Sequence, residues 1–288
     1  MIILKKANDI KSYLSGLPKT VSSIGFVPTM GALHSGHISL ITKAKTENDL
    51  VLCSIFINPT QFNDAKDFEK YPVTIEQDIY LLEKAGCSIL FLPTIDEMYA
   101  KGINNLVHFD LGFIETILDG KYRPGHFQGV CQVVHRLLEI VLPDKLYLGQ
   151  KDFQQCMVLN KMAAMAYPSL QIIICPTQRE RDGLAKSSRN LRLAPEDRLL
   201  AVKIFSTLQF IKNNIKPGDV TNLKQNAIAF LTAKGFKVDY VEICNADSLQ
   251  LLNDWNGKTG IVILIAAFLN GVRLIDNLLI KEQEELDN

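Results

Sequence analysis

Two histidines three residues apart, His34 and His37, stand near the amino terminus in a segment that also carries Gly31 and Gly36. The segment follows a short apolar run at residues 24–27 and leads into a stretch of helical period. The glycines permit tight turns, and the start of a helix offers free N–H groups to an anion. Two imidazoles at a helix start suit a phosphate whose negative charge grows during a reaction. The sequence therefore predicts a phosphate site here.

Simpler interpretations apply to each histidine. A solitary histidine is more often a structural residue than a ligand. As zinc ligands the pair is unsuited, because it lacks the glutamate and the i,i+4 spacing of the metalloprotease motif. The pattern His-x-Gly-His between a strand and a helix is much narrower than a lone histidine, and it favours the phosphate site.

Four other polar segments could carry chemistry. Phe56–Asn63 places neutral amides where a hydroxy acid could be hydrogen-bonded, although the same amides could simply cap a turn. Arg123–Val130 puts a cation and an imidazole before a helical pattern, and Leu148–Gln155 follows a strand and opens a helix. Asp182–Asn190 carries hydroxyls and cations that are fit to hold polyphosphate, but a solvated interdomain linker would have the same composition.

The elements that must position these residues alternate over the first half of the chain. Continuous apolar strands separated by helices indicate a parallel sheet covered on both faces, in which ligands bind beyond the carboxyl ends of the strands. The predicted strands are Ile24–Val27, Leu50–Ile57, Ser88–Leu92, Lys145–Leu148 and Leu170–Cys175, and the predicted helices are Gly36–Thr46, Thr74–Ala85, Gln128–Leu142 and Asp152–Ala166.

The pattern changes after the polar stretch at residues 177–192. Two helical segments are followed by three strand-like segments, which predicts a smaller α+β domain. We place the first domain at residues 1–180 and the second at residues 181–288. The predicted helices are Pro195–Asn213 and Asp219–Lys234, and the predicted strands are Phe236–Cys244, Ile261–Leu269 and Arg273–Ile280.

Composition bounds the class of protein. The chain has 288 residues, 47% of them hydrophobic, and a formal net charge of zero, so no global field favours nucleic acid or an anionic membrane. Its 6 cysteines include no C-x-x-C pair, which is typical of a reducing compartment. We find no signal peptide, and the longest apolar stretch is about half of what a bilayer crossing needs. We expect a cytoplasmic enzyme with no nucleic-acid or membrane partner.

The His-x-Gly-His segment resembles the signature of the nucleotidylyltransferase superfamily and of class I aminoacyl-tRNA synthetases. Taken together and in order, the motifs from about Gly25 to Asn190 resemble the pantothenate synthetase (pantoate–β-alanine ligase) family. The resemblance implies a Rossmann-like doubly wound sheet with a smaller domain that covers the site. It also implies a homodimer, an ATP substrate and a need for Mg²⁺. The implied reaction is an AMP-forming ligation of pantoate and β-alanine to pantothenate through a pantoyl-adenylate, with release of pyrophosphate.

The resemblance also assigns residues. The catalytic residues would be His37, His34 and Lys151. Pantoate and β-alanine would contact Gln61, Gln155 and Asn58, and Asp78 is the candidate metal ligand. ATP would lie along two stretches of the first domain and one polar loop, contacting Met30, Gly31, His34, Gly36, His37, Gly149, Lys151, Asp152, Gln178, Lys186, Ser187, Ser188 and Arg189.

Three positions depart from the family pattern. Gln178 stands where valine is frequent, Lys186 replaces a usual Met or Leu, and Gln150 replaces a common Glu. Lys186 could add a phosphate contact or point to solvent. A His-x-Gly-His enzyme that stops at nucleotide transfer is the nearest alternative, and an RNA-binding protein or an inactive interaction protein is more remote. An amine that changes the products excludes the first, salt-dependent RNA binding identifies the second, and any turnover excludes the third.

Overall fold

The computed structural model describes residues 1–63, 65–100, 102–103 and 106–281. The chain divides into two compact units, Met1–Gln178 and Arg179–Asn288.

The first unit is built on a six-stranded sheet in which every pair of neighbouring strands is parallel. In sheet order the strands are β1 (Ile2–Leu4), β4 (Ile89–Phe91), β3 (Leu50–Ile55), β2 (Ile24–Thr29), β5 (Lys145–Gly149) and β6 (Gln171–Cys175). From β2 the chain proceeds to β3 and β4 on one side and then to β5 and β6 on the other, so the direction of winding reverses between β2 and β5.

The reversal of winding matters because ligands of open α/β sheets bind at this switch point, outside the carboxyl ends of the strands. The backbone pairing of β2 with β5 covers only Gly25↔Lys145 and Phe26↔Leu146, although both strands continue further. The carboxyl-terminal parts of β2 and β5 are therefore not paired with each other, and the segments that follow them begin at an opening in the sheet.

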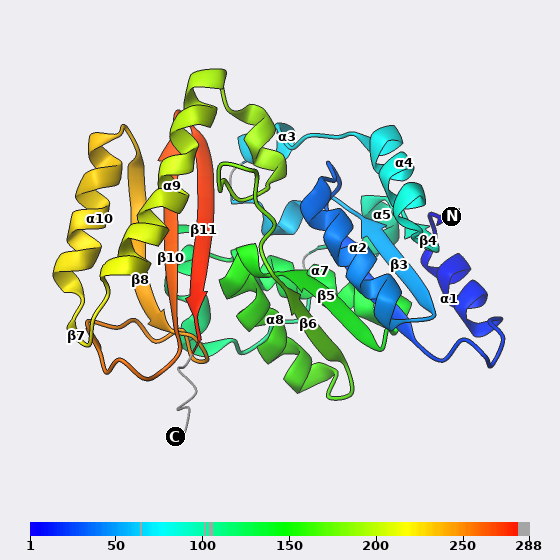
Figure 1. The fold of residues 1–288 in the computed structure, drawn as a ribbon. Helices are drawn as coiled ribbons and strands as arrows, with labels where there is room; N and C mark the ends of the chain where they lie inside the picture. The colour runs from blue at the N-terminus through cyan, green and yellow to red at the C-terminus, as the bar shows by residue number, and fades with distance from the viewer. Residues whose placement is uncertain (64, 101, 104–105, 282–288) are drawn as a thin grey trace. The chain divides into compact units, whose positions relative to one another are not determined.

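Helices cover both faces of this sheet. On one face α2 packs on α4, and the side chains between them and the strands, such as Ile41 and Leu82, are completely buried. On the other face α7 packs against α1 and α8 (Figure 1). The helices of eight or more residues are α1 (Ala7–Ser15), α2 (Ser35–Glu47), α4 (Ile75–Ala85), α7 (His126–Val141) and α8 (Phe153–Ala166). The shorter ones are η1 (Pro59–Gln61), α3 (Ala65–Glu69), α5 (Ile95–Met98), η2 (Gly112–Glu115), α6 (Asp119–Tyr122) and η3 (Gln150–Asp152).

The second unit contains a three-stranded antiparallel sheet in the order β11-β10-β8. Its central strand is an almost continuous apolar run, and the residues of that strand, such as Ile263 and Ile265, are fully buried against two helices. The elements are η4 (Ser188–Arg192), α9 (Pro195–Asn214), α10 (Thr221–Ala233), β8 (Lys237–Asn245), β10 (Ile261–Leu269) and β11 (Val272–Ile280), with a small ribbon of β7 (Gly218–Asp219) and β9 (Asp254–Trp255).

The predicted fold class is confirmed: a doubly wound parallel sheet and a smaller α+β unit. Most predicted bounds agree with the structure to within two residues. Leu50–Ile57 was predicted too long, because Phe56 and Ile57 already leave the sheet as the chain turns toward η1. β1, α1 and the β7–β9 ribbon were not predicted from the sequence. Among the described residues, no helix has the length and apolar character needed to cross a membrane.

Candidate active site

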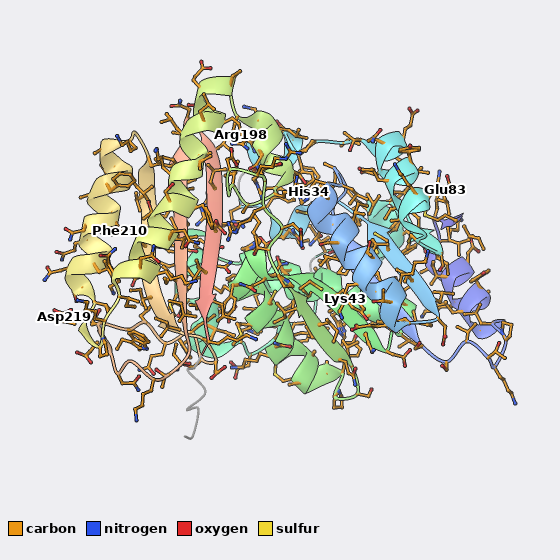
Figure 2. All side chains as sticks on the ribbon, viewed as in Figure 1. His34, Lys43, Glu83, Arg198, Phe210 and Asp219 are labelled. Carbon is orange, nitrogen blue, oxygen red and sulfur yellow. The ribbon has the colours of Figure 1, made fainter. Side chains whose placement is uncertain are left out.

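The two histidines lie at the start of α2, directly after the loop that leaves the carboxyl end of β2. His34 is the N-cap residue, and its Nδ1 accepts a hydrogen bond from the Gly36 N–H at 3.1 Å. The His37 Nδ1 accepts a hydrogen bond from the His34 N–H at 3.3 Å. The two rings lie 4.1 Å apart between centroids, tilted by 33°. Figure 2 shows His34 at this end of the helix and Lys43 farther along it.

These hydrogen bonds define which nitrogen carries the proton in each neutral ring. Because both Nδ1 atoms accept backbone N–H groups, a neutral His34 and a neutral His37 carry their protons on Nε2. Burial, followed by the nearby His34 and Lys151, lowers the pKa of His37 to about 3. His37 is therefore uncharged at neutral pH and offers an Nε2–H donor. The pair is suited to donate hydrogen bonds to phosphate oxygens at a helix start, where the helix dipole also favours an anion.

The loop before the histidines is held by Asp78. Gly31 and Ala32 adopt positive φ values of 84° and 49°, which is a conformation that needs support at the alanine. Asp78 is fully buried; its Oδ2 accepts from the Ala32 N–H at 2.9 Å and its Oδ1 from the Leu33 N–H at 2.8 Å. The Thr74 hydroxyl donates to Oδ1 at 3.0 Å. A carboxylate with no exposed surface and three donors of the protein around it is placed to fix this loop.

Both oxygens of Asp78, the residue that was the candidate metal ligand, accept hydrogen bonds from protein groups, and its binding of a metal stays a prediction. This geometry also explains Gly31, since a Cβ there would lie 3.1 Å from the Asp78 Oδ2 and 3.1 Å from a methyl of Ile55. Among the described residues, no group of three or more His, Cys, Asp or Glu side chains could hold a metal ion.

Asn58 is the N-cap residue of η1, which follows β3, and Gln61 is its last residue. Asn58 is almost completely buried, and its amide donates to the Gly129 carbonyl at 3.1 Å and accepts from the Tyr99 hydroxyl at 2.7 Å. Its side chain thus joins η1 to α7, and a contact of Asn58 with pantoate stays a prediction. The Gln61 amide nitrogen lies 3.0 Å from the Met30 sulfur, so the structure brings these two predicted site residues together.

The backbone of Gln61 is held by a pair of side chains from the segment before α7. The His126 Nδ1 lies 2.8 Å from the Gln61 carbonyl oxygen, and an Arg123 nitrogen lies 3.4 Å from the same oxygen. The other Arg123 nitrogen lies 3.1 Å from the His126 Nε2. With Nδ1 as donor to the carbonyl, His126 accepts from Arg123 on Nε2. Arg123 and His126 were noted in the sequence as a cation and an imidazole, but no role was predicted for them.

The segment after β5 provides the remaining predicted residues of the first unit. Gly149 ends the strand, and η3 carries Lys151 and Asp152, whose charged atoms lie 3.8 Å apart. The positive charge of Lys151 also contributes to the low pKa of His37, after burial and His34, so Lys151 lies in the neighbourhood of this imidazole. The structure thus places a cation from β5 near the imidazoles from β2, at the opening between these strands.

The two adjacent glutamines at the start of α8 have different environments. Gln154 is buried, and its amide donates to the carbonyls of Ile114 and Ile117 and accepts from the Asp119 N–H. Gln155 is only partly buried, so it is the glutamine of this pair that a ligand can reach. A contact of Gln155 with pantoate or β-alanine stays a prediction.

The polar loop of residues 182–190 forms an ordered part of the second unit and is not a linker. Lys186 pairs with Glu180 at 2.9 Å, so this unusual lysine points toward an acidic partner nearby in the chain. The Ser187 hydroxyl accepts from the Arg189 N–H at 3.3 Å, and Ser188 is buried at the start of η4. Gln178 is exposed at the end of the first unit.

The first unit is an all-parallel, doubly wound α/β domain with a glycine-containing helix start at its switch point, which is the class of fold that binds nucleotides. The model of the family "Pantoate-beta-alanine ligase" matches residues 2–279. The chain therefore belongs to the pantoate–β-alanine ligase family and is a ligase.

Individual relatives agree over nearly the whole chain. The pantothenate synthetase of Cytophaga hutchinsonii is 43% identical over 283 residues, which cover 97% of this chain and 99% of the relative. The crystal structure of the Thermus thermophilus pantothenate synthetase matches with a TM-score of 0.87 at 36% identity, covering 96% of this chain and 99% of that one. The Francisella tularensis pantoate–β-alanine ligase, a complex with "Beta-gamma ATP" and β-alanine, matches with a TM-score of 0.83 at 40% identity, covering 97% of each chain.

Proposed function

We propose that this enzyme uses ATP to join pantoate to β-alanine through a pantoyl-adenylate, and that it releases AMP and pyrophosphate. The observation that carries the proposal is the start of α2, where two imidazoles with Nε2–H donors and the nearby Lys151 converge at the switch point of the sheet. Family membership and the ATP-analogue and β-alanine complex of the Francisella relative support the choice of substrates.

In the first half-reaction, a carboxylate oxygen of pantoate attacks the α-phosphorus of ATP, and the bond to the bridging oxygen of pyrophosphate breaks. The carboxylate is already a nucleophile, so this step needs no general base. Catalysis is then mainly alignment of the two substrates and stabilisation of the negative charge that spreads over the phosphate oxygens. His34 and His37 donate hydrogen bonds, Lys151 supplies positive charge, and the amides at the start of α2 add the field of the helix.

Pantoate would be oriented by Gln61 and Gln155. The amide of Gln61 lies beside Met30, and its backbone is fixed by His126 and Arg123. Asn58 acts in this account by holding η1 against α7, because its own amide is already bonded to the protein. A side chain at position 129 would collide with the Thr60 carbonyl at 2.4 Å, so glycine there allows this close approach.

In the second half-reaction, the free amine of β-alanine attacks the acyl carbon of the adenylate, and AMP leaves with the carboxylate-derived oxygen on its phosphate. The amine loses a proton in this step and must therefore be unprotonated when it attacks, against a pKa near 10 in solution. Residues Lys186, Ser187, Ser188 and Arg189 would add phosphate contacts, and exclusion of water would protect the adenylate from hydrolysis.

Mg²⁺ commonly binds through substrate phosphates and one or two carboxylates while it keeps several waters. With Asp78 turned inward, the described donor set fits Mg²⁺ that arrives with the phosphates of ATP better than Mg²⁺ in a cage of protein ligands. When bound, the ion would neutralise phosphate charge. A homodimer and a cytoplasmic location complete the proposal.

Product identification tests the proposed reaction. The purified protein is incubated with ATP, Mg²⁺ and pantoate, with and without β-alanine, and the nucleotide and acid products are identified. Stoichiometric AMP, pyrophosphate and pantothenate, formed only with both substrates, are the expected result. Formation of ADP would exclude the adenylate, and turnover that β-alanine does not change would indicate an enzyme that stops at nucleotide transfer.

A further inference from the structure

Arg179, the first residue of the second unit, is bound by an unusual number of partners within that unit. Its guanidinium forms a bidentate pair with Asp276 of β11, at 2.6 and 3.0 Å. It also donates to the Gly183 carbonyl at 3.1 Å and to the Asn277 carbonyl at 3.2 Å. The guanidinium carbon lies 4.3 Å from the centre of the Phe205 ring, on α9. One side chain thus joins its own loop to a strand and a helix of the second unit.

From these contacts we propose that the Arg179–Asp276 pair is a positioning device for the phosphate-binding loop at residues 186–189. The inference rests on the proposed function, because it assumes that this loop contacts ATP. Neither residue has a role in the chemistry described above. Their action would be indirect, through the backbone that carries Lys186, Ser187, Ser188 and Arg189.

Arg179 supports a short hairpin that is formed by residues 179–185. Residues 179 and 185 pair as an antiparallel bridge, the Glu180 N–H donates to the Leu184 carbonyl at 2.8 Å, and the Gly183 N–H donates to the Glu180 carbonyl at 2.9 Å. Gly183 adopts a φ of 95°, and a Cβ there would lie 2.1 Å from the Phe205 ring. The turn therefore packs tightly on Phe205, and Arg179 holds it there because it donates to the Gly183 carbonyl and stacks on the same ring.

The hairpin leads directly into residues 186–189, which are proposed to bind phosphate. Leu184 and Ala185 are buried in the core of the second unit. The Ala185 carbonyl accepts from the Asn190 side chain at 3.0 Å, and the Asn190 N–H donates to the Ser187 carbonyl at 3.0 Å. The backbone of residues 186–189 is thus tied at both ends, and one of these ties is the hairpin that the arginine supports.

The burial of Asp276 determines how much the Arg179–Asp276 pair contributes. The Asp276 side chain is only 3% exposed, so loss of Arg179 would remove a bidentate, charge-assisted pair from a buried carboxylate. A second bidentate pair joins Asp182 of the hairpin to Arg198 of α9, at 2.8 and 3.2 Å. That pair is exposed on both sides, 30% and 42%, and such pairs contribute little. The chain therefore offers a matched control of the same chemistry on the same hairpin.

The experiment compares Arg179→Lys, Arg179→Gln and Asp276→Asn with the control Arg198→Lys. Lysine keeps the charge at position 179 but cannot form the bidentate pair, so its effect should be the smaller of the two at that position. The measurements are the dissociation constant for ATP by calorimetry, the KM values for ATP and pantoate, and the thermal unfolding temperature.

We expect Arg179→Gln and Asp276→Asn to weaken ATP binding and to raise the KM for ATP by about tenfold or more, since a displacement of about 1 Å can cost a hundredfold in an aligned site. The KM for pantoate should stay within about twofold, Arg179→Lys should be intermediate, and Arg198→Lys should resemble the wild type. Lower unfolding temperatures with unchanged ATP affinity would overturn the proposal, as would an equal loss of affinity for both substrates. A wild type that binds ATP without forming pantothenate refutes the proposed reaction alone, and the ATP dissociation constants of the variants then still decide the inference.

Discussion

Replacing Asp78 with asparagine is expected to disturb the loop that leads into α2, although the side chain keeps its size. The carboxylate accepts hydrogen bonds from the Ala32 and Leu33 N–H groups at 2.9 and 2.8 Å and from the Thr74 hydroxyl at 3.0 Å. An amide presents one oxygen and one NH₂ group. Whichever way the amide is rotated, its NH₂ group faces a backbone N–H, and one buried donor loses its acceptor.

The magnitude follows from these contacts. A buried donor without an acceptor costs about 1–3 kcal/mol, and hydrogen bonds to a charged acceptor are roughly twice as strong as neutral ones. Removing the buried charge offsets part of this loss. We therefore expect the free energy of unfolding to fall by about 2–3 kcal/mol. We also expect kcat/KM to fall at least about tenfold, because Gly31 and Ala32 would no longer be held and the imidazoles follow directly on this loop.

The assay combines denaturant unfolding with initial rates of pyrophosphate release. Glu76→Gln is the matched control, since Glu76 is exposed in the first turn of the same helix. The control should lose less than about 1 kcal/mol, which is the usual effect of a charge near a helix start. If Asp78→Asn unfolds like Glu76→Gln and keeps the wild-type kcat/KM, then the role assigned to Asp78 is incorrect.

Three further predictions concern His37 and Ser54. His37→Ala should slow adenylate formation by about a hundredfold or more while circular dichroism shows an intact fold, as is usual for loss of a preorganised donor; near-normal rates would remove His37 from the mechanism. The pKa of His37 is lowered in the folded state to about 3, so only the unfolded state takes up a proton as the pH falls below 6.5. Between about pH 7.5 and pH 5 the wild type should therefore lose up to about 2 kcal/mol of unfolding free energy relative to His37→Gln, and parallel pH profiles would contradict this. Ser54 is fully buried, and its hydroxyl has no hydrogen-bond partner among the residues that the structure describes, so Ser54→Ala should leave the unfolding free energy unchanged or raise it by up to about 1 kcal/mol. A fall in the unfolding free energy of more than about 1 kcal/mol would show that the hydroxyl has a partner.

Local pattern was sufficient to predict five of the six strands of the parallel sheet and its longer helices other than α1. The apolar runs of β3 and β10 are buried along nearly their whole length, so their sequence carries the signal of a central strand. Ile2–Leu4 was not predicted because a strand of three residues has too few positions to show a period. The start of α2 could be located because strand, glycines and imidazoles follow one another directly in the chain.

Roles that depend on contacts distant in sequence could not be derived in this way. Asp78 bonds to amides 45 and 46 residues away, and nothing near it in the sequence distinguishes that role from a metal ligand. Asn58 has the chemistry of a ligand, but its amide is taken up by Gly129, which lies 71 residues further on. The contacts of Arg179 with Asp276 span 97 residues, so this pair becomes visible only in the fold.

The fate of the carboxylate oxygen of pantoate tests the central claim most directly. Pantoate labelled with ¹⁸O in its carboxylate is turned over with ATP, Mg²⁺ and β-alanine, and the products are analysed by mass spectrometry. A pantoyl-adenylate requires one labelled oxygen to appear in AMP, because the bond from that oxygen to the α-phosphorus persists when the amine displaces AMP. Label in inorganic phosphate with formation of ADP, or AMP that contains no label, would contradict the account.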